Sequence, residues 1–172
     1  NALNNVGASD VYTPQIAGWD SNEARGEELL AYVEELVATT GATKVNLIGH
    51  SQGGTTSRYV ASIRPDLVAS VTSVGSPHFG SEVGDFIKDS PLEGPAIAIG
   101  NAVGVFLAAL SGDTTQQANA MGSLESINTE GAQAFNEQHP QGIRQGACQD
   151  TPYYNAGAWW WPNWVYDYSV ND

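Results

Sequence analysis

The chain has 172 residues, of which 19 are Asp or Glu and 6 are Lys or Arg, so its formal net charge is −13. This length suits one globular domain with a buried core and excludes a multidomain protein. The negative charge repels phosphate backbones and anionic lipid headgroups, which argues against nucleic acid as a partner. Hydrophobic residues make up 41% and charged residues 15% of the chain, a composition typical of a folded protein.

The first elements predicted are a strand and a long helix. Residues 10–16 (DVYTPQI) form a β-like run interrupted by Pro14, and we predict a strand there. A helix is expected next, because Asp20 and Glu23 have the spacing of a capping box. Apolar side chains then recur on one helical face until Gly41, a residue type favoured just after a helix end.

The middle of the chain alternates strands and helices. Residues 44–48 (KVNLI) form a compact β-like run that ends in glycine, and residues 51–63 have helical spacing before Pro65. Residues 68–74 (VASVTSV) carry no charge and are expected to form a strand buried on both faces. This alternation predicts an α/β fold, a mainly parallel sheet flanked by helices.

The second half contains a long apolar segment at residues 94–112. Its apolar part is too short for a membrane span and it lacks basic flanks, so we expect no transmembrane helix. A helix that is apolar nearly all round must be buried, or must meet lipid or another apolar surface part of the time. Residues 123–138 are expected to form a further helix, and Cys148 is either a free thiol or half of a disulfide.

The sequence Gly49-His50-Ser51-Gln52-Gly53 fits the pattern G-x-S-x-G between a predicted strand and a predicted helix. A sharp strand-to-helix turn strains the backbone of Ser51 and presents its hydroxyl above the sheet, and the flanking glycines let the neighbouring backbone fit. The backbone N–H of Gln52, at the start of the helix, is placed to stabilise an oxyanion. We therefore predict a nucleophile elbow, with Ser51 and Gln52 as the catalytic residues of this chain.

The histidines fit the role of general base poorly. His78 lies in the loop after the next strand, where active-site loops gather, but no acid-bearing strand separates it from Ser51. His50 lies inside the elbow and points away from the hydroxyl, and His139 precedes a proline at a helix end, so a purely structural role is open to either.

Residues 45–81, including VNLIGHSQGG and VTSVGSPHFGS, resemble the foldase-dependent secreted triacylglycerol lipases of the Pseudomonas and Burkholderia type. The similarity continues through residues 122–126 and 135–142. The resemblance implies an α/β-hydrolase fold, a Ser-Asp-His triad, a helical lid at residues 94–112, a structural calcium and one disulfide that includes Cys148. It also implies a secreted, extracellular protein with a foldase chaperone as partner.

Several parts of the family pattern fall outside these residues. The strand that supplies the second oxyanion N–H is expected before Asn1, and the catalytic Asp and His, the calcium ligands and the second Cys after Asp172. No metal site is expected within the chain. The sequence thus resembles a central fragment, a single domain over residues 1–172 that is incomplete at both ends. The visible strands agree, since they would leave an apolar parallel sheet with unpaired edges.

The function expected of the complete enzyme is hydrolysis of long-chain triacylglycerols at an oil–water interface through an acyl-enzyme intermediate. A short-chain carboxylesterase is the nearest alternative, although a small soluble ester needs no cover as large as residues 94–112. A non-catalytic module that binds apolar ligands on the same fold is the second alternative. Reaction with a fluorophosphonate separates the two classes, since only an activated serine reacts.

Overall fold

The structure is a computed structural model that describes residues 2–8, 10–89, 120–143 and 165–168. Its elements in chain order are α1 (Ala2–Asn5), α2 (Asn22–Thr40), β1 (Val45–His50), α3 (Gln52–Ile63), β2 (Val68–Val74), α4 (Glu82–Asp89), α6 (Ala120–Ile127), α7 (Thr129–Gln138) and β3 (Val165–Tyr168). Strands β1 and β2 are parallel, and β3 pairs antiparallel with β2. The predicted α/β fold is confirmed, whereas the antiparallel strand was not predicted.

Helix α2 matches its prediction except at its first residue. The N-cap is Ser21, whose hydroxyl accepts a hydrogen bond from the N–H of Ala24 at 3.1 Å, rather than Asp20. The helix ends before Gly41, whose φ of 73° is left-handed and suits glycine. The predicted boundaries of this helix are therefore confirmed, although the capping residue is different.

Two other expectations are wrong. Residues 10–17 contain no strand, because Pro14 cannot donate to a ladder and no described strand pairs with this segment. The single helix expected at 123–138 is instead the pair α6 and α7. The break falls at Asn128, whose side chain accepts from the N–H of Gly131 at 2.7 Å and so begins a new helix.

The core lies between the sheet and helices α2 and α3. Its buried residues come from α2 (Leu29, Leu30, Val33), β1 (Leu47), α3 (Val60, Ala61), and the turn into β2 and β2 itself (Leu67, Val68, Val71). The other face of the sheet is more open in the part that the structure describes, where Ile48 is 57% exposed. Strand β2 is buried at Val68, Val71 and Ser73 but exposed at Ala69 and half-buried elsewhere, so the expectation that both of its faces are buried is wrong for the described residues.

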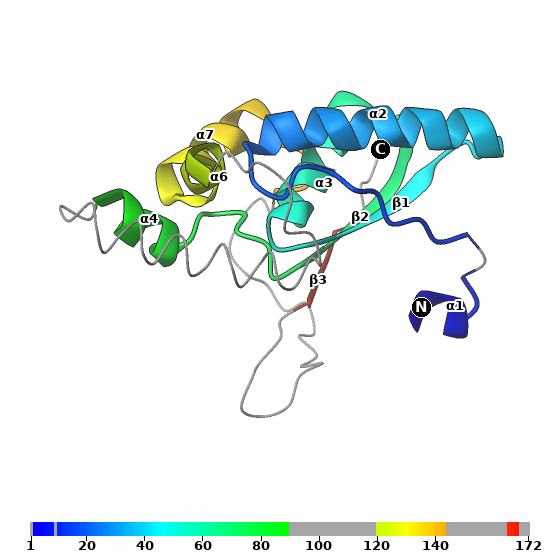
Figure 1. Cartoon of the computed structure of the whole chain (residues 1–172), viewed down its shortest axis with the longest axis horizontal. Coiled ribbons are helices and arrows are strands. Elements are labelled where there is room, and N and C mark those ends of the chain that lie inside the picture. Colours follow the sequence, from blue (N-terminus) through cyan, green and yellow to red (C-terminus); the bar gives the residue numbers. More distant parts are fainter. Residues whose placement is uncertain (1, 9, 90–119, 144–164, 169–172) are drawn as a thin grey trace.

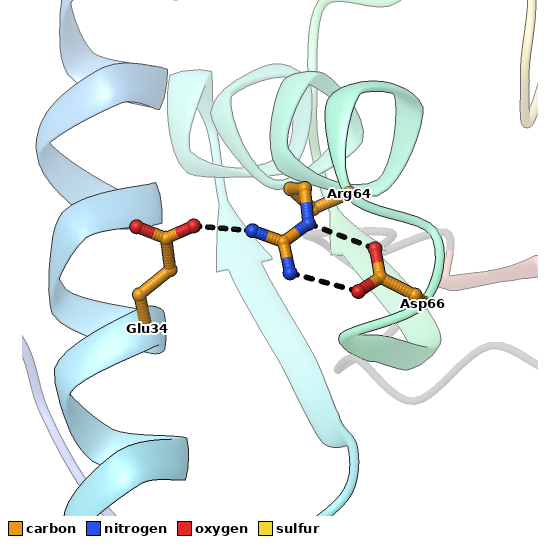
Figure 2. Close-up of polar contacts among 3 residues, drawn as sticks. All are labelled: Glu34, Arg64 and Asp66. Atoms are coloured by element: carbon orange, nitrogen blue, oxygen red, sulfur yellow. Dashed lines mark hydrogen bonds and ion pairs between the residues drawn. The ribbon is translucent and has the colours of Figure 1, made fainter.

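Helices α2 and α3 approach closely because Gly26 has no side chain: a Cβ there would overlap the ring of Tyr59. Figure 1 shows α4, α6 and α7 gathered at the end of the molecule where α2 begins. At the far end of α3, Arg64 bridges Glu34 of α2 and Asp66 of the turn before β2 (Figure 2).

No described helix has the length and apolar character that would carry it through a bilayer. The segment 94–112 and Cys148 lie outside the described residues, so the lid and the disulfide stay predictions.

Candidate active site

Ser51 occupies a strained turn between β1 and α3. Its φ of 54° and ψ of −130° make it the one non-glycine residue with a positive φ in the described ranges. Such a backbone costs free energy and persists only where the surroundings hold it. Here the N–H of Ser51 donates to the carbonyl of Val74 at the end of β2, at 2.9 Å. The turn is thus fixed to the carboxyl end of the neighbouring parallel strand.

The two glycines of the motif differ in their surroundings. A Cβ on Gly49 would overlap the backbone of Gly53 and Gly54, so the sharp turn requires glycine at this position. A Cβ on Gly53 would meet no described atom within 4 Å. The expectation that both positions need small residues therefore holds for Gly49, while the close approach on the helix side involves Gly54, whose added Cβ would overlap the Ser76 hydroxyl.

The hydroxyl of Ser51 is half-buried and does not cap α3, although Ser51 is the N-cap residue. Because α3 begins at Gln52, the first backbone N–H groups of the helix have no partner within it. These groups and the helix dipole favour a negative charge beside Ser51. The turn therefore places a hydroxyl and an anion-stabilising helix end together, which is what acyl transfer needs.

The side chain of Gln52 is buried and forms three hydrogen bonds that the sequence did not predict. Its Oε1 accepts from Arg25 at 2.9 Å and from Ser123 at 2.8 Å. Its Nε2 donates to the backbone carbonyl of Asp20 at 2.8 Å. Residues from α2, α3 and α6, far apart in the sequence, thus meet around one side-chain amide. From the sequence alone, only the polar character of Gln52, Arg25 and Ser123 could be recognised.

Arg25 extends this cluster toward the segment before α2. Its Nη1 also donates to the carbonyl of Gly18 at 2.8 Å. Burial lowers the pKa of Arg25 from its ordinary value, and the nearby carboxylates of Glu28 and Asp20 oppose that shift. The guanidinium stays charged and binds neutral oxygens, which makes it a structural part of the site.

The imidazoles of His78 and His139 make hydrogen bonds away from Ser51. The His78 ring contacts Arg58 Nη1 at 3.2 Å, and burial followed by the charge of Arg58 lowers its pKa to about 4. The His139 ring bonds the Ser62 hydroxyl at 2.8 Å and packs against the ring of Tyr59. His50 is exposed at the end of β1. These contacts give the imidazoles of His78 and His139 partners other than Ser51.

The described residues contain no group of three or more His, Cys, Asp or Glu side chains that could hold a metal ion. The ligands of the calcium implied by the resemblance are expected after Asp172, so that calcium stays a prediction.

Residues 3–149 match the family model described as the alpha/beta hydrolase fold. The chain belongs to the alpha/beta hydrolase fold family. The family places a nucleophile at the turn after a central strand, which is where Ser51 lies. A solved structure, the Bacillus licheniformis lipase BlEst2 in its propeptide form, shares the fold with a TM-score of 0.53 at 22% identity, over 70% of this chain and 23% of that chain.

Several curated relatives are more similar to this chain in sequence. The triacylglycerol lipase of Vibrio cholerae is 45% identical over 154 residues, which are 87% of this chain and 49% of the relative. The triacylglycerol lipase of Pseudomonas fragi is 47% identical over 147 residues, 83% of this chain and 50% of the relative. The Burkholderia plantarii triacylglycerol lipase is 44% identical over 148 residues, 81% of this chain and 41% of the relative. The predicted resemblance is confirmed, and the chain spans about half the length of these relatives.

Proposed function

We propose that this chain carries the nucleophile elbow of a triacylglycerol lipase, with Ser51 as the nucleophile and the backbone N–H of Gln52 as an oxyanion donor. The observation that carries the proposal is the left-handed backbone of Ser51 between β1 and α3. A serine without a catalytic role has no reason to hold such strain. The relatives named triacylglycerol lipase support the choice of substrate.

The reaction would proceed in two stages. The Ser51 oxygen bonds to the ester carbonyl carbon while a base takes the hydroxyl proton, and the carbonyl oxygen becomes an anion beside the Gln52 N–H. The ester C–O bond then breaks, and the glyceride leaves with that proton. Water hydrolyses the acyl-enzyme in the second stage, releasing the fatty acid and restoring the hydroxyl.

We propose that the base and its orienting acid, a His and an Asp, come from residues outside this chain. The support is that His78 and His139 are bonded to Arg58 and Ser62, and that the chain spans about half the length of its relatives. A structural calcium, a foldase partner, secretion and a disulfide through Cys148 are likewise proposed for the complete protein, on the strength of the resemblance.

The test uses the full-length protein that contains this chain. A fluorophosphonate should label the wild type at Ser51, and Ser51→Ala should lose labelling together with about 10⁶-fold in turnover of emulsified triacylglycerol. Circular dichroism should be the same for both proteins.

The alternatives give different results in this assay. A carboxylesterase would be labelled but would turn over a dissolved p-nitrophenyl butyrate far better than the emulsion. A binding module would hydrolyse neither substrate and would not be labelled at all.

A further inference from the structure

The side chain of Gln52 is held more firmly than an oxyanion donor strictly needs, since only its backbone N–H would contact the substrate. Its Oε1 receives two donors, from Arg25 and Ser123, and its Nε2 has an acceptor in the carbonyl of Asp20. With both ends of the amide bonded, the side chain has a single orientation. Gln52 itself is 7% exposed, so water has little access to replace a lost bond.

Ser123 is the member of this cluster that lies farthest from Gln52 in the sequence. It lies on α6, is 2% exposed, and donates its hydroxyl hydrogen to Gln52 Oε1 at 2.8 Å. A buried hydrogen bond between neutral groups is well suited to fix geometry, because a buried donor or acceptor that loses its partner costs free energy.

A donor at an oxyanion site must be held within about half an ångström of its productive place. Gln52 is the first residue of α3, where backbone amides are least restrained by the helix itself. A locked side chain on that residue limits rotation of its peptide group. We propose that Ser123 is a positioning residue of the active site: its bond to the Gln52 side chain holds the Gln52 backbone N–H where the oxyanion forms.

Helix α6 also supplies a matched control. Ser126, on the same helix, accepts a hydrogen bond from the backbone N–H of Asn22 in α2, at 3.1 Å, and is not one of the three hydrogen-bond partners of the Gln52 side chain described above. Removing the hydroxyl of Ser126 therefore weakens the docking of α6 without changing the Gln52 cluster. A comparison of Ser123→Ala with Ser126→Ala separates positioning of the oxyanion donor from simple attachment of the helix.

The inference rests on the proposed function, so the experiment measures hydrolysis of a dissolved p-nitrophenyl ester by the full-length protein and its two variants. We expect Ser123→Ala to lower kcat about 10-fold with KM within twofold, because loss of a whole oxyanion donor costs about 10²- to 10³-fold and a displaced donor costs less. The rate constant for fluorophosphonate inactivation should fall in parallel, since the phosphorus–oxygen group occupies the oxyanion position. Ser126→Ala should keep both values within twofold of the wild type.

A second pair of variants tests the coupling directly. Gln52→Leu removes the acceptor, so adding Ser123→Ala to it should cause no further fall in kcat. Should Ser123→Ala lower the melting temperature more than Ser126→Ala does, Ser123→Cys decides the matter. A thiol is a weaker donor of similar shape. If Ser123→Cys has an intermediate kcat and the same melting temperature as the wild type, the result supports positioning.

Equal losses in Ser123→Ala and Ser126→Ala would show that α6 acts only as a support, and an unchanged kcat in Ser123→Ala would show that the bond is dispensable. Additive losses in the Gln52→Leu background would also overturn the inference. An active wild type with any of these results leaves the proposed function intact. A wild type that hydrolyses no ester overturns both.

Discussion

The two arginines of the α3 region, Arg58 within the helix and Arg64 at its end, bind in opposite ways. The Arg58 side chain is buried, at 3% residue exposure, and donates to the carbonyl of His139 at 2.8 Å, the carbonyl of Gln141 at 3.1 Å and the side chain of Asn136 at 3.1 Å. The Arg64 side chain is 37% exposed and pairs with the carboxylates of Glu34 and Asp66 (Figure 2).

The comparison shows that burial, more than charge, decides how much a hydrogen bond or ion pair of an arginine contributes to stability. Water replaces the partners of Arg64 when they separate, so an exposed ion pair contributes little. Without Arg58, the carbonyl of His139 would be left buried and unbonded, and the acceptors on Asn136 and Gln141, which are less buried, would also lose their donor. They also belong to the segments that surround the loop after β2, because Asn136 donates to the carbonyl of His78 at 2.7 Å. The part of α3 around Arg58 is thus where polar bonds set geometry.

The largest effect is expected at the elbow, where this geometry is tightest. Gly49→Ala places a Cβ against the backbone of Gly53 and should lower hydrolysis by the full-length protein at least about 100-fold, since misplaced catalytic groups cost that much. Gly53→Ala is the matched control, because nothing described lies within 4 Å of its Cβ, and its activity should stay within about threefold. Similar losses in both variants would contradict this difference between the two glycines.

The next largest effect should separate the two arginines. Arg58→Met should lower the free energy of unfolding by about 3 kcal/mol, because three acceptors lose their donor and one of them, the carbonyl of His139, is buried. Arg64→Met in the same protein serves as the comparison, and urea unfolding measures both. A smaller loss for Arg58→Met than for Arg64→Met would reverse the conclusion drawn from burial.

His78, which contacts the buried Arg58, should make the stability of the protein depend on pH. Burial and the charge of Arg58 lower its pKa from an ordinary 6.5 to about 4, so between these values the unfolded chain binds a proton that the folded protein does not. The folded state is therefore most stable, as far as His78 is concerned, above pH 6.5, and it loses stability relative to the unfolded chain as the pH falls toward 4. The melting temperature of the wild type should therefore fall more steeply over this range than that of His78→Gln. Parallel curves would show that His78 does not titrate in this way.

The smallest effect is expected for the exposed ion pairs of Arg64 with Glu34 and Asp66 in Figure 2. Arg64 lowers the pKa of Asp66, chiefly through the hydrogen bond between the two side chains, yet both groups are exposed to water. Arg64→Met should lower the melting temperature by no more than about 3 °C, and 1 M NaCl should remove most of that difference. A large, salt-independent loss would instead indicate packing by the side-chain stem.

Local patterns predicted the elements that position the elbow. The apolar runs at 44–48 and 68–74 and the helical spacing at 51–63 depend on neighbours in the sequence, and all three elements formed close to where they were expected. Failures came where the answer depends on distant residues. The run at 10–16 has strand-like composition but no described partner strand, and the pairing of β3 with β2 joins segments far apart in the chain.

The candidate site was predictable to the same extent. The pattern around Ser51 located the turn, because its glycine spacing reports a local steric need. The cluster on Gln52 could not be found in this way, since Ser123 comes close only after α6 packs beside α2. A serine in a helix carries no sign of its partner. The signal that could have revealed it is its place within the lipase-like residues 122–126, where the resemblance gave no role.

The backbone of Ser51 also bears on how selection acts on this protein. With φ at 54° and ψ at −130°, this backbone conformation costs glycine less free energy than serine, so the fold alone gives no reason to keep a serine there. Stability and activity therefore make opposing demands on one residue. A library screened for thermal resistance without an activity screen should enrich glycine at position 51, while one screened for turnover should retain serine at the cost of stability.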